Sequence, residues 1–281
     1  MNKLLNITIA IPIKNEVEVL QGCIDAIGED FVEKIILIDS GSTDGSVEIA
    51  KRNNIEILDF TWDGKFPKKR NWFLRNHKPT TKWILFLDAD EYITEAFKTE
   101  IRNSIIDENK VGFWLSYSRY FLGKKMKWGY PMRKLALFKV GAGEYEKIEE
   151  NNWSALDMEI HEHPILNGKT GVVKSEIDHL DFRGISHYIA KHNEYASWEA
   201  ERILKSSNDS LPKKFWTRKQ KIKYRLLFSP FSGVIYFFGN YFLFGGFLDG
   251  SRGLAFSILK ASYFTQIYCK LTELKTNKKN I

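Results

Sequence analysis

The residues Asp88-Ala89-Asp90-Glu91 directly follow the apolar run 83–87 and place three carboxylates within four positions. A short apolar run bounded by acids is typical of a buried parallel strand, and open α/β sheets bind ligands at the carboxyl ends of such strands. Side chains on an extended segment point the same way every second residue, so Asp88 and Asp90 can converge. Two hard oxygen donors suit Mg²⁺ or Mn²⁺ with a phosphorylated ligand. The pattern predicts metal-assisted chemistry on a diphosphate.

A structural interpretation of the same residues stays open at this point. Asp is a good N-cap, and a helical pattern begins at Thr94. Asp88 and Asp90 could therefore only end a strand and start a helix. The tetrad alone does not decide between the two interpretations, so the elements around it must.

Size and composition indicate a folded protein. A chain of 281 residues with 43% hydrophobic and 14% aromatic content can bury one large domain plus an appendage, which excludes a disordered protein. Cys23 and Cys269 form no metal-spaced or redox motif, which fits a reducing cytoplasm without a disulfide framework. The N-terminal apolar stretch breaks at Pro12 without a small-residue cleavage site, so we expect a first strand there rather than a signal peptide.

Charge is concentrated near the C-terminus. Residues 211–281 carry 13 Lys and Arg against 2 acids, a net charge of +11, so residues 1–210 carry −4 of the total +7. The basic residues flank an uncharged aromatic segment, 226–248, whose 23 residues compare with the roughly 20 needed for a span. Such flanks favour an anionic membrane surface over nucleic acid. Gly, Ser, Pro and Asn interrupt the segment, so interfacial or re-entrant helices are favoured over a true span or an ordinary helical subdomain.

Strands and helices alternate along the first hundred residues. We expect strands at 6–13, 34–38, 55–60 and 83–87. We expect helices at 16–27 and 68–76, and between them a helix that follows the polar turn 40–45 and ends at about residue 53. Ser42, Thr43 or Asp44 could cap the second helix. The alternation predicts a doubly wound, largely parallel sheet with right-handed crossovers, and the loops 12–16, 39–44 and 88–91 should face one crevice. A helix near 94–106, a mixed sheet extension and a helix at 186–205 are expected to follow.

With these loops in order, the chain resembles a family 2 glycosyltransferase of the GT-A fold. The matching stretches are residues 9–16 (IAIPIKNE), 38–45 (IDSGSTDG), 69–71 (KRN) and 87–91 (LDADE). Downstream, His161-Glu162, His179-Leu180-Asp181 and residues 245–253 look like the subgroup that contains lipopolysaccharide core β-1,4-glucosyltransferases. The resemblance implies an α/β GT-A nucleotide-sugar-binding fold, a Rossmann-like mostly parallel sheet flanked by helices.

The domain limits follow from this resemblance. Residues 1–183 would form the catalytic domain, with a nucleotide-sugar-binding part at 1–110 and an acceptor and catalytic part at 111–183. Residues 184–281 would form a helical, basic-aromatic extension that associates with the membrane.

The resemblance also implies roles in donor binding. Pro12, through its neighbouring backbone, and Asp39, as acceptor for the uracil N–H, would hold the base. Arg70 would lie near the donor's phosphates, and Asp88 would bind ribose or metal-bound water. The full donor-binding set implied is Pro12, Asn15, Glu16, Asp39, Ser42, Arg70, Asp88, Ala89 and Asp90.

A Mg²⁺ or Mn²⁺ ion would be held by Asp90, Asp88 and His179, although a structural role for His179 is an open alternative. Inversion needs a carboxylate that deprotonates the acceptor hydroxyl. Glu162 is the expected base because the family places an acid after a His in this region, and Glu159 is the second candidate. An exposed strand edge with solvated charges is the structural alternative for residues 159–163.

An aromatic and basic group is expected at the acceptor site, since rings stack on sugars and Arg binds phosphate, although core packing would explain part of it. Its members are Tyr117, Arg119, Tyr120, Trp128, Tyr130 and Arg133. The charge run of Lys65, Lys68, Lys69 and Arg70 is expected to be a solvated helix face, with only Arg70 functional.

The expected function is an inverting, metal-dependent transfer of a hexose, glucose first, from a UDP-sugar to a lipopolysaccharide-core or other lipid-linked acceptor. The enzyme would be cytoplasmic, attached peripherally to the inner face of the cytoplasmic membrane, with no nucleic-acid partner. Alternatives are transfer to another polysaccharide or a protein, a non-catalytic nucleotide-sugar-binding module, and a phosphatase of the haloacid dehalogenase type. That phosphatase class also has Asp-x-Asp after an apolar strand, but typically Thr or Val where this chain has Tyr92.

Overall fold

The computed structural model describes residues 3–147, 157, 159, 163–180, 183–208 and 225–279. The chain divides into two compact units. Unit 1 contains Met1–Arg119 and Met132–Leu180, and unit 2 contains Tyr120–Pro131 and Asp181–Ile281. Each unit is described by itself.

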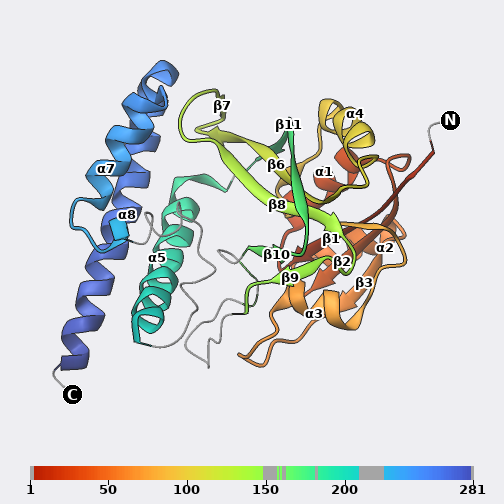
Figure 1. Cartoon of the computed structure of the whole chain (residues 1–281), viewed down its shortest axis with the longest axis horizontal. Coiled ribbons are helices and arrows are strands. Elements are labelled where there is room, and N and C mark those ends of the chain that lie inside the picture. The colour runs from red at the N-terminus through yellow and green to blue at the C-terminus, as the bar shows by residue number, and fades with distance from the viewer. Residues whose placement is uncertain are drawn as a thin grey trace. The chain divides into compact units, whose positions relative to one another are not determined.

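Unit 1 begins with alternating strands and helices. They are β1 (Leu5–Ile13), α1 (Val17–Ile27), β2 (Val32–Asp39), α2 (Ser46–Arg52), β3 (Glu56–Asp59), α3 (Lys69–Asn76) and β4 (Trp83–Phe86). The strands lie in the order β3-β2-β1-β4 and all pair in parallel. Figure 1 shows β1, β2 and β3 next to one another. The expected strands and helices of this region are confirmed to within a few residues at most ends.

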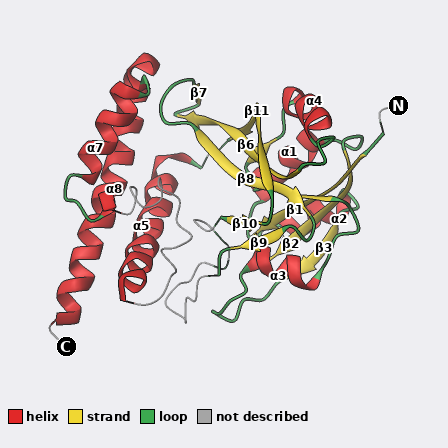
Figure 2. Cartoon of the chain, viewed as in Figure 1, coloured by secondary structure: helices red, strands yellow, loops and turns green. Residues whose placement is uncertain are grey.

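The second half of unit 1 extends this sheet with mixed pairing. Its elements are β5 (Glu91–Tyr92), α4 (Glu95–Ser104), β6 (Lys110–Phe121), β8 (Met132–Lys139), β9 (Gly143–Tyr145), β10 (Pro164–Leu166) and β11 (Lys169–His179). Strand β8 is antiparallel to both β4 and β6, β11 is parallel to β6, and β5 is antiparallel to β11. A curled mixed sheet flanked by helices results (Figure 2). Strands β9 and β10 form a separate two-stranded sheet.

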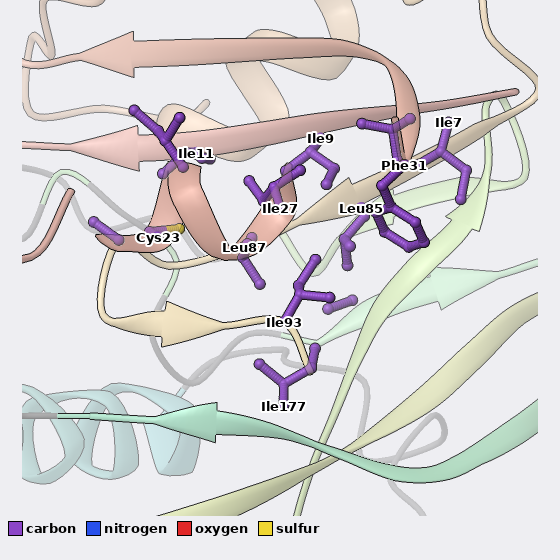
Figure 3. Close-up of a cluster of buried hydrophobic side chains, with 14 of the residues drawn as sticks. Ile7, Ile9, Ile11, Cys23, Ile27, Phe31, Leu85, Leu87, Ile93 and Ile177 are labelled. Atoms are coloured by element: carbon purple, nitrogen blue, oxygen red, sulfur yellow. The ribbon is translucent and has the colours of Figure 1, made fainter. Parts of the chain in front are cut away.

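Successive residues of the central strands contribute to different hydrophobic clusters, as the two-residue period of a strand requires. Ile9 and Leu85, which are register partners, belong to a cluster that α1, α2 and α4 cover. The neighbouring Ala10 and Phe86 belong to a second cluster with Phe73 of α3. Figure 3 shows the first cluster, in which Leu87 and Ile27 also take part. Burial on both faces explains why these strands read as continuous apolar runs.

Unit 2 is built around helices. They are α5 (Gly184–Asn208), α7 (Ser232–Phe238), the π-helical η2 (Gly239–Leu243), the 3-10 helix η3 (Gly246–Asp249) and α8 (Gly250–Lys279), and the short strand β7 (Lys124–Met126) pairs with β6. Ala196, Ala200 and Ile203 of α5 pack with Tyr263 and Ile267 of α8. The two helices and α7 lie side by side in Figure 1.

The segment 226–248 therefore forms several short helical pieces rather than one long helix. Helix α7 can approach α8 closely because position 233 is glycine: a Cβ there would lie 2.2 Å from Thr265 Oγ1 and 2.5 Å from the Ala261 carbonyl oxygen. Within the described ranges, no helix combines the length and apolar character that crossing a membrane requires.

Candidate active site

The loops after β1 and β2 are joined by side-chain hydrogen bonds. Asn15 adopts a left-handed conformation at φ 57°, which Asn tolerates, and its backbone N–H donates to Ser42 Oγ at 2.9 Å. Its side-chain oxygen accepts from Thr43 N at 2.8 Å. Glu16 N donates to Ser46 Oγ at 2.8 Å. The two predicted donor-binding loops therefore meet at the carboxyl ends of adjacent strands.

Asp44 differs from its expected role. Its Oδ1 accepts from Ser46 N, but its Oδ2 accepts from Val17 N at 2.9 Å, the first residue of α1. The N-cap of α2 is Gly45, which has no side chain to accept a bond. Although partial burial acts in the opposite direction, the hydrogen bonds from Ser46 and Val17 lower the pKa of Asp44. Asp44 thus accepts the first backbone N–H of both α1 and α2 and connects the two helices.

Asp39 ends β2 and is buried. Its carboxylate accepts from Gly41 N at 3.2 Å, Ser42 N at 3.0 Å and Ser42 Oγ at 2.5 Å. These bonds satisfy a buried charge and fix its direction, as a buried carboxylate requires. The hydroxyl and amide groups that donate to Asp39 come from the turn 40–42, which lies in the loop predicted to bind the donor.

The N-terminus of α3 is held by residues that follow β9 in sequence. Glu159 is buried, and its two carboxylate oxygens accept from Arg70 N at 2.9 Å and Asn71 N at 3.0 Å. The Arg70 guanidinium donates in turn to the Glu159 carbonyl. Lys69 N donates to the Asp157 carbonyl at 3.1 Å. Glu159 therefore supplies the capping that the first turn of α3 lacks from its own residues.

The charge run at the start of α3 is not a solvated face. Lys65 is exposed as expected, but Lys68, Lys69 and Arg70 are all buried, so that prediction is wrong for two of the three lysines. The Lys69 ammonium donates to the Ile13 carbonyl at 3.1 Å and lies 3.4 Å from Asp157 Oδ2. Burial lowers the pKa of Lys69, against the attraction of Asp157. Lys69 thus connects α3 to the end of β1.

The tetrad after β4 forms a turn rather than the expected extended segment: β4 ends at Phe86, and Glu91 N donates to the Asp88 carbonyl at 3.0 Å. Ala89 is buried in the cluster that α1 and α4 cover, and Asp88 faces α3, where Arg70 is its partner. Arg70 Nη2 lies 2.6 Å from Asp88 Oδ1. Although burial raises the pKa of Asp88, the charges of Lys134 and Arg70 outweigh it and hold this pKa well below the usual range. Asp88 is a fixed anion.

Asp90 and His179 meet because β5 pairs with the end of β11. Glu91 is the register partner of His179, and Leu180 N donates to the Asp90 carbonyl at 2.9 Å. These bonds place His179 Nε2 3.4 Å from Asp90 Oδ2. Burial alone would lower the pKa of His179, but the Asp90 carboxylate raises it. Two residues separated by almost ninety positions therefore form one pair.

The helix-capping interpretation of the tetrad is wrong. Helix α4 begins at Glu95, and its N-cap is Thr94, whose hydroxyl accepts from Phe97 N at 3.2 Å. Neither Asp88 nor Asp90 caps this helix, since both lie before β5. Their carboxylates are left for the charged groups described above.

The donor set of this pair fits a divalent ion that also binds phosphate. Across the described part of the chain, no three His, Cys, Asp or Glu side chains are arranged to hold a metal ion by themselves. Asp90 and His179 would supply two ligands, and Mg²⁺ or Mn²⁺ characteristically takes few protein ligands and completes its shell with phosphate oxygens and water.

The residues predicted for acceptor binding fall in both units. Tyr117, Arg119 and Arg133 belong to unit 1, and Trp128 belongs to unit 2. Tyr117 is buried, and its hydroxyl has no hydrogen-bond partner among the described residues. Trp128 is 49% exposed, and its backbone N–H donates to Asp249 Oδ2 at 2.9 Å. The 245–253 stretch therefore holds the loop that carries Trp128.

The first candidate base, Glu162, lies outside the described residues, as does His161. Lys134 is a site residue that the sequence analysis missed. It lies on β8 with its ammonium 2.8 Å from Asp88 Oδ2 and bonded to Glu91 Oε1. A single lysine directly before the buried run 135–138 was the only sign of it in the sequence.

The sequence is similar to a known protein family and to several curated proteins. Residues 8–157 match the family described as glycosyl transferase family 2. An uncharacterized glycosyltransferase of Rickettsia felis is 24% identical over 274 residues, which cover 95% of this chain and 90% of that protein. A TPR repeat-containing protein of Synechococcus elongatus is 29% identical over 107 residues, and this chain spans about a quarter (26%) of its length.

Among solved structures, a mannosyltransferase of Pyrobaculum calidifontis in complex with GDP-Man and Mn²⁺ is similar in fold. The similarity covers 96% of this chain and 88% of that one, with a TM-score of 0.54 and 13% identity. At this level of identity the similarity concerns the fold alone, and it extends over both units.

Proposed function

Because the chain belongs to glycosyl transferase family 2 and is a glycosyltransferase, we propose that it is an inverting, metal-dependent enzyme that transfers a hexose from a UDP-sugar. Glucose is the proposed sugar, and a lipopolysaccharide core or another lipid-linked glycan is the proposed acceptor. The observation that carries the proposal is the pairing of Arg70 with Asp88 and of His179 with Asp90 around one strand end. A fixed cation and a metal-binding pair are the groups that a sugar diphosphate needs.

The donor is proposed to lie along the carboxyl ends of β1, β2 and β4. Asp39, buried and oriented by Ser42, would accept the N–H of uracil. Arg70 is held by Glu159 and Asp88, and its Nε has no partner among the described residues. A buried guanidinium with an unused donor suits an anionic oxygen of the nucleotide.

Asp90 and His179 are proposed to hold Mg²⁺ or Mn²⁺. The bound metal would neutralise the charge that develops on the departing nucleoside diphosphate. The protein's part is to keep the Asp90 carboxylate and the His179 ring facing each other, through the backbone bond from Leu180 and the β5–β11 pairing. Such orientation of ligands before binding is what a metal site requires.

Glu162 is proposed as the base that deprotonates the acceptor hydroxyl, three residues after Glu159. Glu159 itself is less suited to that task, since both of its carboxylate oxygens accept backbone N–H groups at the start of α3. A base needs an oxygen within hydrogen-bond reach of the proton that it takes. Glu159 is therefore proposed as an anchor for α3.

Family membership excludes two of the alternative functions named in the sequence analysis. The chain is a glycosyltransferase, so the phosphatase and the non-catalytic binding module are both wrong. Three strands with polar turns precede the Asp-x-Asp, which is the order that the family resemblance implies. Transfer to another polysaccharide or to a protein stays an alternative that the choice of acceptor in an assay can test.

Attachment to the inner face of the cytoplasmic membrane is also proposed. Large apolar side chains are exposed at the N-cap of α7 and on α7, η2 and η3. They include Phe231, Val234, Phe238, Phe242, Leu243, Phe247 and Leu248. Phe238 and Phe242 stack with ring centroids 5.5 Å apart. Residues 211–281 carry a net charge of +11, which favours anionic lipid. An apolar face of aromatic rings beside basic residues is typical of interfacial binding.

The decisive experiment is a donor screen on the purified protein. UDP-glucose, UDP-galactose and GDP-mannose would each be added with Mn²⁺, and thermal stabilisation and slow hydrolysis would be measured. We expect stabilisation by UDP-sugars that requires the metal and is lost in Asp90→Asn. Asp25→Asn, at an exposed position on α1, is the matched control. A preference for GDP-mannose, or stabilisation without metal, would contradict the proposal.

A further inference from the structure

Lys134 is a charged residue in the centre of the site to which no role has been given so far. It projects from β8, where Leu115 of β6 is its register partner. Its ammonium lies 2.8 Å from Asp88 Oδ2, is bonded to Glu91 Oε1, and is 5.0 Å from the centroid of the Tyr117 ring. Two acids of the tetrad therefore share one lysine.

These contacts occupy the acids on both sides of Asp90. Asp88 has one oxygen on Lys134 and the other on Arg70, so cations from two different elements hold it. Glu91 is buried, with Oε1 on Lys134 and Oε2 accepting from Asp88 N at 3.1 Å. Neither acid can turn towards a metal ion without giving up a charge-assisted bond.

We propose that Lys134 is a positioning residue that keeps Asp88 and Glu91 from binding a divalent ion. The ion then enters the site only together with the diphosphate of the donor. This inference rests on the proposed function, since it presupposes that Asp90 and His179 hold the metal. Lys134 would set the order of binding and touch neither the sugar nor the acceptor.

The physical reason is the balance of charge in the tetrad. Three carboxylates within four residues would by themselves attract a divalent cation strongly, and a lysine between two of them opposes that attraction. A diphosphate brings negative charge of its own and supplies the remaining oxygen ligands. The site can therefore bind the metal ion together with the nucleotide, although it binds the metal ion alone only weakly. A metal ion bound before the donor would have no diphosphate to neutralise and would not assist transfer.

The test is Mn²⁺ binding measured without turnover, by the electron paramagnetic resonance signal of free Mn²⁺, with and without UDP. Lys134→Met removes the charge and keeps a side chain of similar length over Tyr117. Lys134→Arg keeps the charge and should behave like wild type. Lys139→Met is the matched control, because Lys139 lies on the same strand but binds Glu108.

For wild type we expect weak Mn²⁺ binding alone and at least tenfold tighter binding with UDP. Lys134→Met should bind Mn²⁺ alone at least tenfold more tightly than wild type, while Lys134→Arg and Lys139→Met should not. In turnover, Lys134→Met should lower the KM for Mn²⁺ together with kcat. A merely structural lysine would not tighten metal binding when removed.

Three results would overturn the inference. The first is equal binding of Mn²⁺ by wild type with and without UDP. This result needs no variant, so it refutes the inference even if Lys134→Met does not fold. Unchanged Mn²⁺ affinity in folded Lys134→Met, with wild type still binding Mn²⁺ and UDP together, would refute the role of Lys134 and leave the proposed function intact. If wild type bound no Mn²⁺ even with UDP, the metal-dependent function itself would fail, and the inference with it.

Discussion

Replacing Glu159 with Gln distinguishes an anchor from a base. As an anchor, the Glu159 carboxylate accepts the N–H groups of Arg70 and Asn71 at the first turn of α3. In Glu159→Gln one oxygen can still accept one of these N–H groups, but the amide NH₂ faces the other donor. The change removes one negative charge and one acceptor and leaves the volume nearly unchanged.

The cost follows from these contacts. Leaving one buried N–H without an acceptor costs about 1–3 kcal/mol. Losing the charge at a helix N-terminus costs about a further 0.3–2 kcal/mol. Because Glu159 is 2% exposed, water does not replace the lost bond, and we expect a loss of about 2–4 kcal/mol in the free energy of unfolding. The start of α3 also carries Arg70, so binding of UDP with Mn²⁺ should weaken as well.

Urea denaturation followed by tryptophan fluorescence measures the first effect, and calorimetric titration of UDP with Mn²⁺ the second. Glu144→Gln is the control: Glu144 pairs with Arg75 at 2.7 Å on the surface, so this change should cost under about 1 kcal/mol. Wild-type stability and wild-type donor binding together with lost turnover would refute the anchor and make Glu159 the base.

Three further outcomes are expected. Thr94→Ala removes the N-cap of α4 and should lower the free energy of unfolding in urea by about 1 kcal/mol, and an unchanged midpoint would contradict the capping role. Asp90 raises the pKa of His179 above its ordinary value near 6.5, and only the neutral ring binds metal. Mn²⁺ affinity in the presence of UDP should therefore rise with pH through the range just above 6.5, and this pH dependence should be lost in His179→Gln. A wild-type affinity that does not change with pH would remove His179 from the metal site. Phe238→Ser combined with Phe242→Ser should weaken sedimentation with anionic vesicles at least tenfold without changing donor hydrolysis, and unchanged sedimentation would place the membrane contact elsewhere.

The first hundred residues could be predicted well from the sequence because their physics is local. Continuous apolar runs, each bounded by Gly, Asn or Asp, indicate strands buried on both faces. The alternation of Leu85 and Leu87 with Ile84 and Phe86 between two hydrophobic clusters confirms that pattern. The alternation stops where the strand stops: residues 88–91 form a turn closed by the hydrogen bond from Glu91 N to the Asp88 carbonyl, so the strand period does not place Asp90.

Burial of charge was not predictable in the same way. Lys68 and Lys69 stand in a polar run whose composition is typical of solvent exposure. Lys69 is buried because its ammonium donates to the Ile13 carbonyl of β1 and its backbone N–H donates to the Asp157 carbonyl, almost ninety residues downstream. No local pattern reports a partner at that distance. The same limit applies to Asp44, whose bond to Val17 joins helices that the sequence treats separately.

The tetrad shows where local inference ends and topology begins. Asp88, Asp90 and Glu91 are visible as acids after a strand, but their partners come from three other elements: Arg70 from α3, Lys134 from β8 and His179 from β11. The mixed half of the sheet brings the last two there, because β8 lies next to β4 and the end of β11 pairs with β5. A parallel sheet alone would have supplied carboxylates without the lysine that opposes them. The chemistry of the acids therefore depends on the antiparallel strands, the part of the fold with the weakest sequence pattern.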